Sequence, residues 1–413
     1  MTARHSFWLY LQVQHKSLRA QLEYSACACL TLLRDHITLT CLIHRRNIAP
    51  RKRGRAMKIN KTFFQIPVRR HATRAWKLVI WLTVVFVLNL CHPLCFAQET
   101  ITLVGSGSSV PAPLYAKWAE AYNKRNPKIQ MRYVPLGTSE GIKQISHGSG
   151  DFAAGEAQLT AQERKEGDLI ELPSIVIGIV PIYNLPGLQT ELRFSGEVLA
   201  EIYLGQLKTW NASPIAKLNP DASLPNIPIK VVYRPGGKGS NYVFSEFLSK
   251  TSPKFRSELG TSPSPKWPVG LPAERSSDMA DKVKNEAGSI GYVEAQYAIK
   301  TNIPYGRVLN PAGRFVKATP ETIAAACHAV ETPQWDKFSA SLTNAPGEDS
   351  FPITSFTWLY LRTKSTDAQR ADALADLLNW VYTDGQQLAE QDGYTELPPA
   401  LLAKVKIRIK SFR

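Results

Sequence analysis

The sequence predicts an α/β fold, because a unit made of a β-strand, a loop rich in glycine and serine, and a helix recurs along the chain. Such units occupy residues 101–122, 129–145 and 231–244. In α/β proteins, ligands bind beyond the carboxyl ends of the strands, which is where these loops fall. The loops are therefore the first candidates for a binding site.

The unit at 231–244 has the features of an anion site. Its β-branched run ends at Arg234, whose planar guanidinium suits two oxygens of a tetrahedral anion, and Lys238 adds a mobile charge. Glycines such as Gly239 let the backbone approach a ligand, and the first amides of the next helix lack intrahelical partners. Ser240 can cap that helix or donate to the ligand. A surface loop with two solvated cations is the alternative.

The same turn is not a Walker A loop. Gly239 stands between Lys238 and Ser240, whereas that motif needs the lysine to be followed directly by serine or threonine. The sequence therefore gives no support for nucleotide hydrolysis.

The other units add further loops of the same kind. The first contains an amphipathic helix at 113–122, and the second has an alternating strand at 129–134 followed by a loop at 137–141. A fourth segment, 151–156, places Glu156 after a strand of small residues. Three helix N-termini and one carboxylate thus lie at strand ends.

The net charge of +16 belongs to the start of the chain. Residues 1–97 hold 16 of the 50 Lys and Arg residues but only 2 of the 34 Asp and Glu residues, so residues 98–413 keep a net charge of +2. A nucleic-acid-binding body is not indicated.

A signal peptide is predicted at 57–97. A positively charged region precedes an apolar run of 13 residues at 78–90, and a small-x-small ending follows at 95–97, which favours cleavage near Ala97 and export over an uncleaved anchor. Residues 1–56 have no globular pattern, and we interpret them as a non-native or disordered extension.

The positions of the cysteines exclude a disulfide framework after residue 97. Five of the six cysteines lie in 1–97, so the remaining chain keeps Cys327, which can form neither an internal disulfide nor a metal cluster. Because Cys327 lies in an alanine-rich helical stretch, a packed side chain is favoured over a nucleophile.

Several longer motifs resemble one family. The motifs lie at residues 105–118, 137–145, 201–205, 266–270, 288–294 and 352–355. Together they make the sequence similar to the periplasmic phosphate-binding proteins of phosphate ABC transporters over nearly all of residues 100–410.

The resemblance implies a periplasmic-binding-protein fold of type II, with a hinge and a ligand cleft between two lobes. One lobe would comprise 98–176 plus 349–413, and the other 177–348. It also implies a monomer that binds inorganic phosphate in the periplasm without a metal or cofactor and delivers it to a permease in the inner membrane. No enzymatic activity is implied.

The resemblance also implies the residues that contact the ligand. These residues are Ser109, the amide of Val110, Thr138, Ser139, Glu156, Arg234, Lys238, Gly239 and Ser240. The family has Thr-Phe at 109–110, Asp at 156 and Asp-Gly-Ser-Gly-Thr at 236–240, so this chain loses an acidic residue and gains a lysine in the turn.

Glu156 determines which anion is expected. A carboxylate repels a dianion unless the ligand contributes a proton, so an acceptor here favours protonated phosphate over sulfate. If the longer Glu156 pairs with Lys238 instead, then arsenate, an organic phosphate or a phosphonate becomes more plausible.

Two alternatives come from other classes of protein. Residues 137–141 fit the Gly-x-Ser-x-Gly pattern of a serine hydrolase, with Ser139 as nucleophile and His328 downstream. The pattern is common in loops, however, and the other histidine of residues 98–413, His147, lies close to Ser139 in sequence. The same fold could also serve as a surface adhesin.

Overall fold

The computed structural model describes residues 100–330, 340–364 and 367–410, together with the single residues 81 and 338. The predicted extension at 1–56 and, apart from Trp81, the predicted signal peptide at 57–97 lie outside the described residues. Among the residues that are described, no helix is long and apolar enough to cross a membrane.

The prediction of an α/β fold is confirmed. The strands are β1 (Ile101–Gly107), β2 (Ile129–Pro135), β3 (Phe152–Gly155), β4 (Leu169–Tyr183), β5 (Arg193–Phe194), β6 (Lys230–Tyr233), β7 (Leu271–Pro272), β8 (Ser289–Glu294), β9 (Arg307–Leu309), β10 (Phe315–Val316) and β11 (Thr354–Arg362). The helices are α3 (Ala112–Arg125), α4 (Thr138–Ser146), α5 (Ala161–Glu166), α6 (Gly196–Tyr203), α7 (Ser213–Leu218), α8 (Gly239–Thr251), α9 (Pro253–Glu258), α10 (Ser276–Asn285), α11 (Ala295–Lys300), α12 (Pro320–His328), α13 (Ala368–Val381), α14 (Asp384–Gln391) and α15 (Pro399–Ile409).

Eight strands form one sheet in the order β2-β1-β3-β11-β4-β8-β6-β7, and β10, β9 and β5 form a smaller sheet. Within the large sheet, β1, β2 and β3 run parallel, and so do β6, β7 and β8. The long strand β4 joins the two groups, because it pairs with β11 over residues 169–178 and with β8 over residues 179–183, antiparallel to both.

This topology decides where the strand ends lie. Since β11 is antiparallel to β3, β4 runs in the direction of β3, whereas β8 and β6 run in the opposite direction. The carboxyl ends of β1–β3 and of β6 therefore face each other. The lobe boundary predicted at residue 176 falls inside β4, and the division into two lobes stays a prediction.

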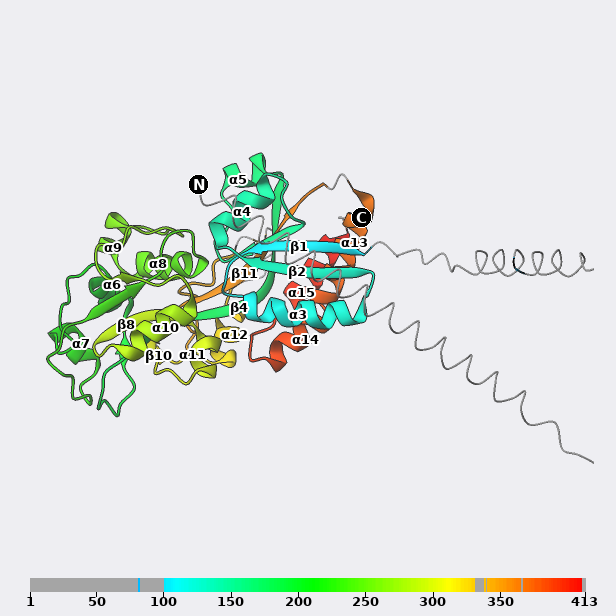
Figure 1. Ribbon diagram of the computed structural model, residues 1–413. Helices are drawn as coiled ribbons and strands as arrows, with labels where there is room; N and C mark the ends of the chain where they lie inside the picture. Colours follow the sequence, from blue (N-terminus) through cyan, green and yellow to red (C-terminus); the bar gives the residue numbers. More distant parts are fainter. Residues whose placement is uncertain (1–80, 82–99, 331–337, 339, 365–366, 411–413) are drawn as a thin grey trace, which may run out of the picture. The chain divides into compact units, whose positions relative to one another are not determined.

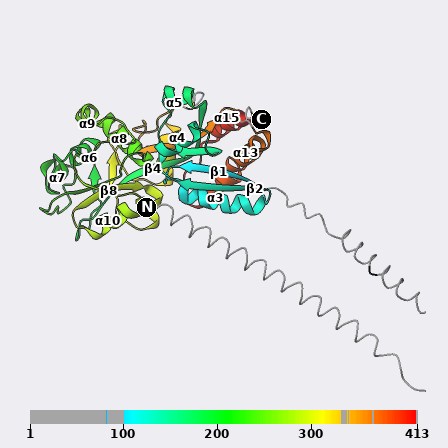
Figure 2. The ribbon, with the colours of Figure 1, turned by 45° about the horizontal axis from the view of Figure 1, so that its top comes forward.

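Helices cover the sheet at both groups of strands. Along the first group, α13 contacts β1 and α3, so the last part of the chain packs beside its first elements (Figures 1 and 2). Along the second group, α8 and α10 pack on β8. The predicted amphipathic helix is α3, with Leu114, Trp118 and Tyr122 buried.

Two helices begin where glycines end the preceding strand or turn. The helix α4 begins at Thr138, inside the stretch 137–141 that was predicted to be a loop, because Gly137 takes a φ of 111° and turns the chain directly into the first helical turn. The helix α8 begins at Gly239, and its N-cap residue is Lys238. Cys327 is fully buried in α12, as predicted for a packed side chain.

Candidate functional site

The loops that follow β1, β2 and β6 meet at one place. The N–H of Ser139, at the start of α4, donates to the carbonyl oxygen of Gly237 at 3.2 Å. The guanidinium of Arg234 donates through Nη2 to Ser109 Oγ, in the loop after β1, at 3.1 Å. The two groups of parallel strands thus contact each other through the loops in which the site residues were predicted.

Arg234 is buried, with 2% of its surface exposed. Its Nη1 donates to Ser276 Oγ at 3.2 Å, and the Ser276 hydroxyl donates in turn to Glu294 Oε1 at 3.0 Å. Among the described residues, Arg234 Nε has no hydrogen-bond partner, and no carboxylate forms an ion pair with the guanidinium. A buried guanidinium without a direct counter-charge strongly favours an anionic ligand.

The backbone around Arg234 is held by two buried side chains. The Arg234 N–H donates to the hydroxyl of Tyr292 at 3.1 Å, and Tyr292 in turn bonds the side-chain oxygen of Asn241. The Asn241 amide nitrogen donates to the carbonyl oxygens of Arg234 and Pro235 at 3.1 and 2.9 Å. The start of α8 therefore fixes the position of the residue that follows β6.

The first turn of α8 brings two predicted residues into the interior. Ser240 is 2% exposed, and its Oγ has no partner within the described part of the chain, so the option that it caps the helix is wrong. At Gly239, a Cβ atom would lie 1.6 Å from Glu156 Oε2, so only glycine permits this approach. The carboxylate and the N-terminus of α8 are in direct contact.

Glu156 follows β3 and is fully buried. Its carboxylate accepts hydrogen bonds from Thr357 Oγ1 at 3.1 Å, from Thr138 Oγ1 at 3.3 Å and from the Ser108 hydroxyl. Burial raises the pKa of Glu156 to about 7, with a smaller upward contribution from Glu294, while the three hydroxyls act in the opposite direction. The group can therefore change its protonation state near neutral pH.

Lys238 does not pair with Glu156, and that alternative is wrong. Its Nζ lies 3.2 Å from Glu274 Oε2, on a side chain that is 68% exposed, while the Lys238 side chain itself is 18% exposed. The long Glu156 carboxylate is instead satisfied by hydroxyl groups, and Lys238 lies at the rim.

The backbone amides of two predicted residues already have partners inside the protein. The Val110 N–H donates to Ser108 Oγ at 3.1 Å, and the Ser139 N–H is bonded to Gly237. For Ser139 as a hydrolase nucleophile, no hydrogen bond in the described ranges joins it to a histidine, and the ring of His147 is bonded to the carbonyl oxygen of Lys143 at 2.7 Å.

Sequence reasoning missed four polar residues of this cluster. Ser108 stands in the Gly/Ser loop that was singled out, directly beside Ser109, so its loop gave a usable signal. Thr357, Ser276 and Glu294 lie far apart in the chain, on β11, α10 and β8. Glu294 ends the motif at 288–294, which gave it no role, and no local pattern marks the other two. Only the topology of the sheet brings them to Glu156 and Arg234.

Two hollows lie away from the predicted site residues. Two hollows of about 520 and 500 Å³ share Thr190 and Glu191, and neither is lined by any of the nine predicted residues. Within the described ranges, no group of three or more His, Cys, Asp or Glu side chains could hold a metal ion. The cluster around Arg234 is buried and polar, and its donors without partners, Arg234 Nε and Ser240 Oγ, suit an anionic ligand.

The comparisons with known proteins point in the same direction. A PBP superfamily domain matches residues 96–385. The phosphate-binding protein PstS of Haemophilus influenzae is 33% identical over 331 residues, covering 79% of this chain and 97% of the relative. The phosphate-binding protein PstS of Xylella fastidiosa strain 9a5c is 32% identical over 309 residues, covering 75% and 85%.

Solved structures share the fold. A high-affinity periplasmic phosphate-binding protein, PfluDING, bound with phosphate, has a TM-score of 0.61 at 18% identity, covering 74% of this chain and 93% of the other. The phosphate-binding protein of Stenotrophomonas maltophilia has a TM-score of 0.57 at 16% identity, covering 75% and 94%. The names of these proteins describe binding proteins and not enzymes.

Proposed function

This chain belongs to the PBP superfamily, and we propose that it binds inorganic phosphate in the periplasm and delivers it to an ABC importer. It acts as a monomer, exported by a cleaved signal peptide, and docks on a permease in the inner membrane. The relatives at 32 and 33% identity are phosphate-binding proteins over three quarters or more of this chain, which supports this function.

The observation that carries the proposal is the pair of buried donors without partners. Arg234 Nε and Ser240 Oγ have no hydrogen-bond partner among the described residues, although both side chains are only 2% exposed. An unsatisfied buried polar group costs about 1–3 kcal/mol, and more when it is charged. A tetrahedral oxyanion beside Arg234 and the first turn of α8 would supply the missing acceptors.

The remaining contacts follow from the geometry. Ser109 would donate a hydroxyl hydrogen bond, and Thr138 would do so after its hydroxyl turns away from Glu156. The amides of Gly239 and Ser240 would direct the positive end of the α8 dipole at the anion, and Lys238 would add charge from the rim. The backbone amides of Val110 and Ser139 would contribute only after their present bonds to Ser108 and Gly237 rearrange.

Glu156 supplies the selectivity. An ionised carboxylate accepts a hydrogen bond from a protonated oxygen of HPO4²⁻ or H2PO4⁻. Sulfate carries no proton near neutral pH and would be repelled. A site that demands such a hydrogen bond can discriminate by about 10⁴ or more. Because Lys238 pairs with Glu274, Glu156 is available for this role.

Calorimetric titration tests the proposal. Protein freed of bound anions is titrated with phosphate, sulfate and arsenate at pH 8, where Glu156 is largely ionised. We expect phosphate to bind far more tightly than sulfate. A folded protein that binds neither phosphate nor arsenate contradicts the proposed function.

A further inference from the structure

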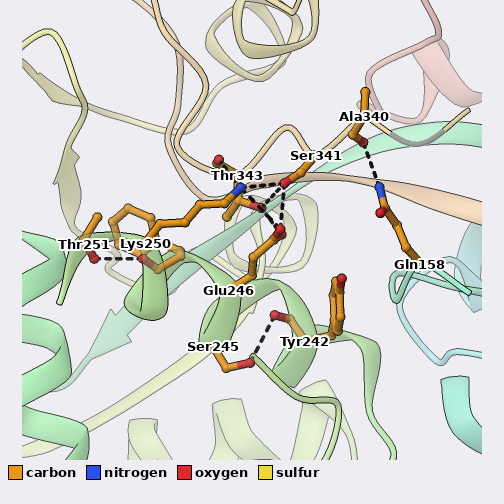
Figure 3. Close-up of polar contacts among 10 residues, drawn as sticks. Gln158, Tyr242, Ser245, Glu246, Lys250, Thr251, Ala340, Ser341 and Thr343 are labelled. Atoms are coloured by element: carbon orange, nitrogen blue, oxygen red, sulfur yellow. Dashed lines mark hydrogen bonds and ion pairs between the residues drawn. The ribbon is translucent and has the colours of Figure 1, made fainter. Parts of the chain in front are cut away.

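The helix α8 begins at the proposed anion site and runs to a polar cluster at its other end (Figure 3). Glu246 accepts hydrogen bonds from Ser341 Oγ at 2.8 Å and from the Thr343 hydroxyl. Lys250 Nζ donates to Ser341 Oγ at 2.7 Å and to the carbonyl oxygen of Thr343 at 2.9 Å. Glu246 and Lys250 also form an ion pair at 3.3 Å, four residues apart on one face of the helix.

The same short segment is bonded to the opposite wall of the site. Gln158 Nε2 donates to the carbonyl oxygen of Ala340 at 3.1 Å, as Figure 3 shows. Gln158 lies two residues after Glu156, on the segment that follows β3. We call Ala340, Ser341 and Thr343, with their partners Gln158, Glu246 and Lys250, the clasp.

We propose that Glu246 and Lys250 are positioning residues for the anion, which act by holding α8, through the clasp, at a fixed angle to the segment that carries Glu156. This inference rests on the proposed function. Neither residue touches the ligand, because the part of α8 that faces the anion is its first turn, at Gly239 and Ser240.

A small rotation of α8 at the clasp displaces its first turn by a larger distance, because the two lie far apart along the helix. At a rise of 1.5 Å per residue, Ser240 lies about 9 Å along the helix axis from Glu246, so a rotation of about 10° at the clasp moves the first-turn amides by about 1.5 Å. Shifts of this size are enough to weaken preorganised hydrogen bonds. No side chain caps α8, so its angle is set at one end by the hydrogen bonds of the Asn241 side chain and at the other by the clasp.

The clasp is only partly shielded from solvent, so its effect on phosphate binding can be distinguished from an effect on the stability of the protein. The side chains of Glu246 and Lys250 are 15% and 36% exposed, so their ion pair alone contributes little to the free energy of unfolding. Breaking the clasp should therefore change binding more than it changes the melting temperature.

The test compares Lys250→Met with Lys254→Met. Lys254 forms an ion pair with Glu258, also four residues apart, at 3.9 Å on the neighbouring helix α9, so the control removes the same charge from the same kind of pair. We expect Lys250→Met to weaken phosphate binding at least fivefold, chiefly through faster dissociation, and Lys250→Arg to restore most of the affinity. Lys254→Met should stay within twofold of the unsubstituted protein.

Hydrogen exchange of the protein without added anion supplies a readout that does not depend on phosphate. Lys250→Met should speed exchange at residues 239–244, remote from the substitution, while Lys254→Met should not. Unchanged phosphate affinity, equal weakening by both variants, or faster exchange confined to residues near 250 and 341 overturns the inference. Failure of the unsubstituted protein to bind phosphate would contradict the proposed function instead, and the exchange pattern would still decide whether the clasp holds α8.

Discussion

The N–H of Ser139 lies 3.2 Å from the carbonyl oxygen of Gly237 and donates to it, so the first turn of α4 rests directly on the turn that precedes α8. This backbone hydrogen bond joins the loops that follow β2 and β6 beside Gly137 and Gly237. Both glycines have positive φ values, 111° and 81°, and a Cβ at Gly137 would lie 3.1 Å from the Gly237 oxygen. The contact therefore depends on backbone conformations that glycine adopts readily, and at Gly137 a side chain would also crowd the Gly237 oxygen.

Arg234→Ala should weaken phosphate binding by more than tenfold, because the guanidinium is buried and makes no direct ion pair within the described chain. Arg234→Lys should recover only part of the loss, since an ammonium group lacks the planar fork. Calorimetry measures both. Arg275→Ala, which removes the same charge from a largely exposed side chain, is the control, and equal affinity of Arg234→Ala and Arg275→Ala would exclude the assigned role.

Glu156→Gln should reduce the preference for phosphate over sulfate by at least about 100-fold, because an amide can donate to sulfate where a carboxylate repels it. Competition titrations of the two anions give the ratio. Glu258→Gln removes a negative charge from an exposed position on α9 and should leave the ratio unchanged. A Glu156→Gln variant that still rejects sulfate would show that another group sets the selectivity.

The stability of the protein should fall as pH rises through the range set by Glu156. Burial raises its pKa from 4.5 to about 7, so the folded chain holds this proton more tightly than the unfolded chain does. The destabilisation begins near pH 4.5 and is fully present above pH 7, where it amounts to about 3 kcal/mol. In buffers without phosphate or sulfate, Glu156→Gln should therefore raise the melting temperature at pH 8 but not at pH 4. An equal shift at both pH values would point to packing and not to protonation.

Gly239→Ala should abolish phosphate binding, because its Cβ would lie 1.6 Å from Glu156 Oε2 and 2.6 Å from Thr138 Oγ1. Combining it with Glu156→Asp should recover part of the affinity, since the shorter carboxylate withdraws from the new methyl group. Calorimetry and thermal denaturation, measured side by side, separate lost binding from lost folding. A Gly239→Ala variant with normal affinity would contradict the close approach of α8 to Glu156.

The strand, loop and helix units could be predicted because each is local in the sequence. Periodicity placed α3, and the end of a β-branched run placed Arg234 directly after β6. The glycines predicted where the turns lie, but they did not predict that α4 begins as early as Thr138. That boundary depends on the φ of Gly137, which local composition does not reveal.

The partners of the charged residues could not be predicted in the same way. A pair between Lys238 and Glu156 was one expectation, but the fold brings Glu274 within 3.2 Å of the Lys238 Nζ instead. Thr357 reaches Glu156 from 201 residues further along the chain, because β11 is inserted between β3 and β4 in the sheet. Such contacts are set by strand order and not by any pattern near the residues themselves.

The strand β4 has a consequence for how the molecule comes apart. Its first residues pair with β11 and its last with β8, so both groups of strands form backbone hydrogen bonds with the same fifteen-residue strand. If β4 loses its order beside one group of strands, the other group also loses hydrogen-bond partners. Heating residues 100–410 should accordingly produce a single cooperative melting event, even though the parallel strands fall into two separate groups.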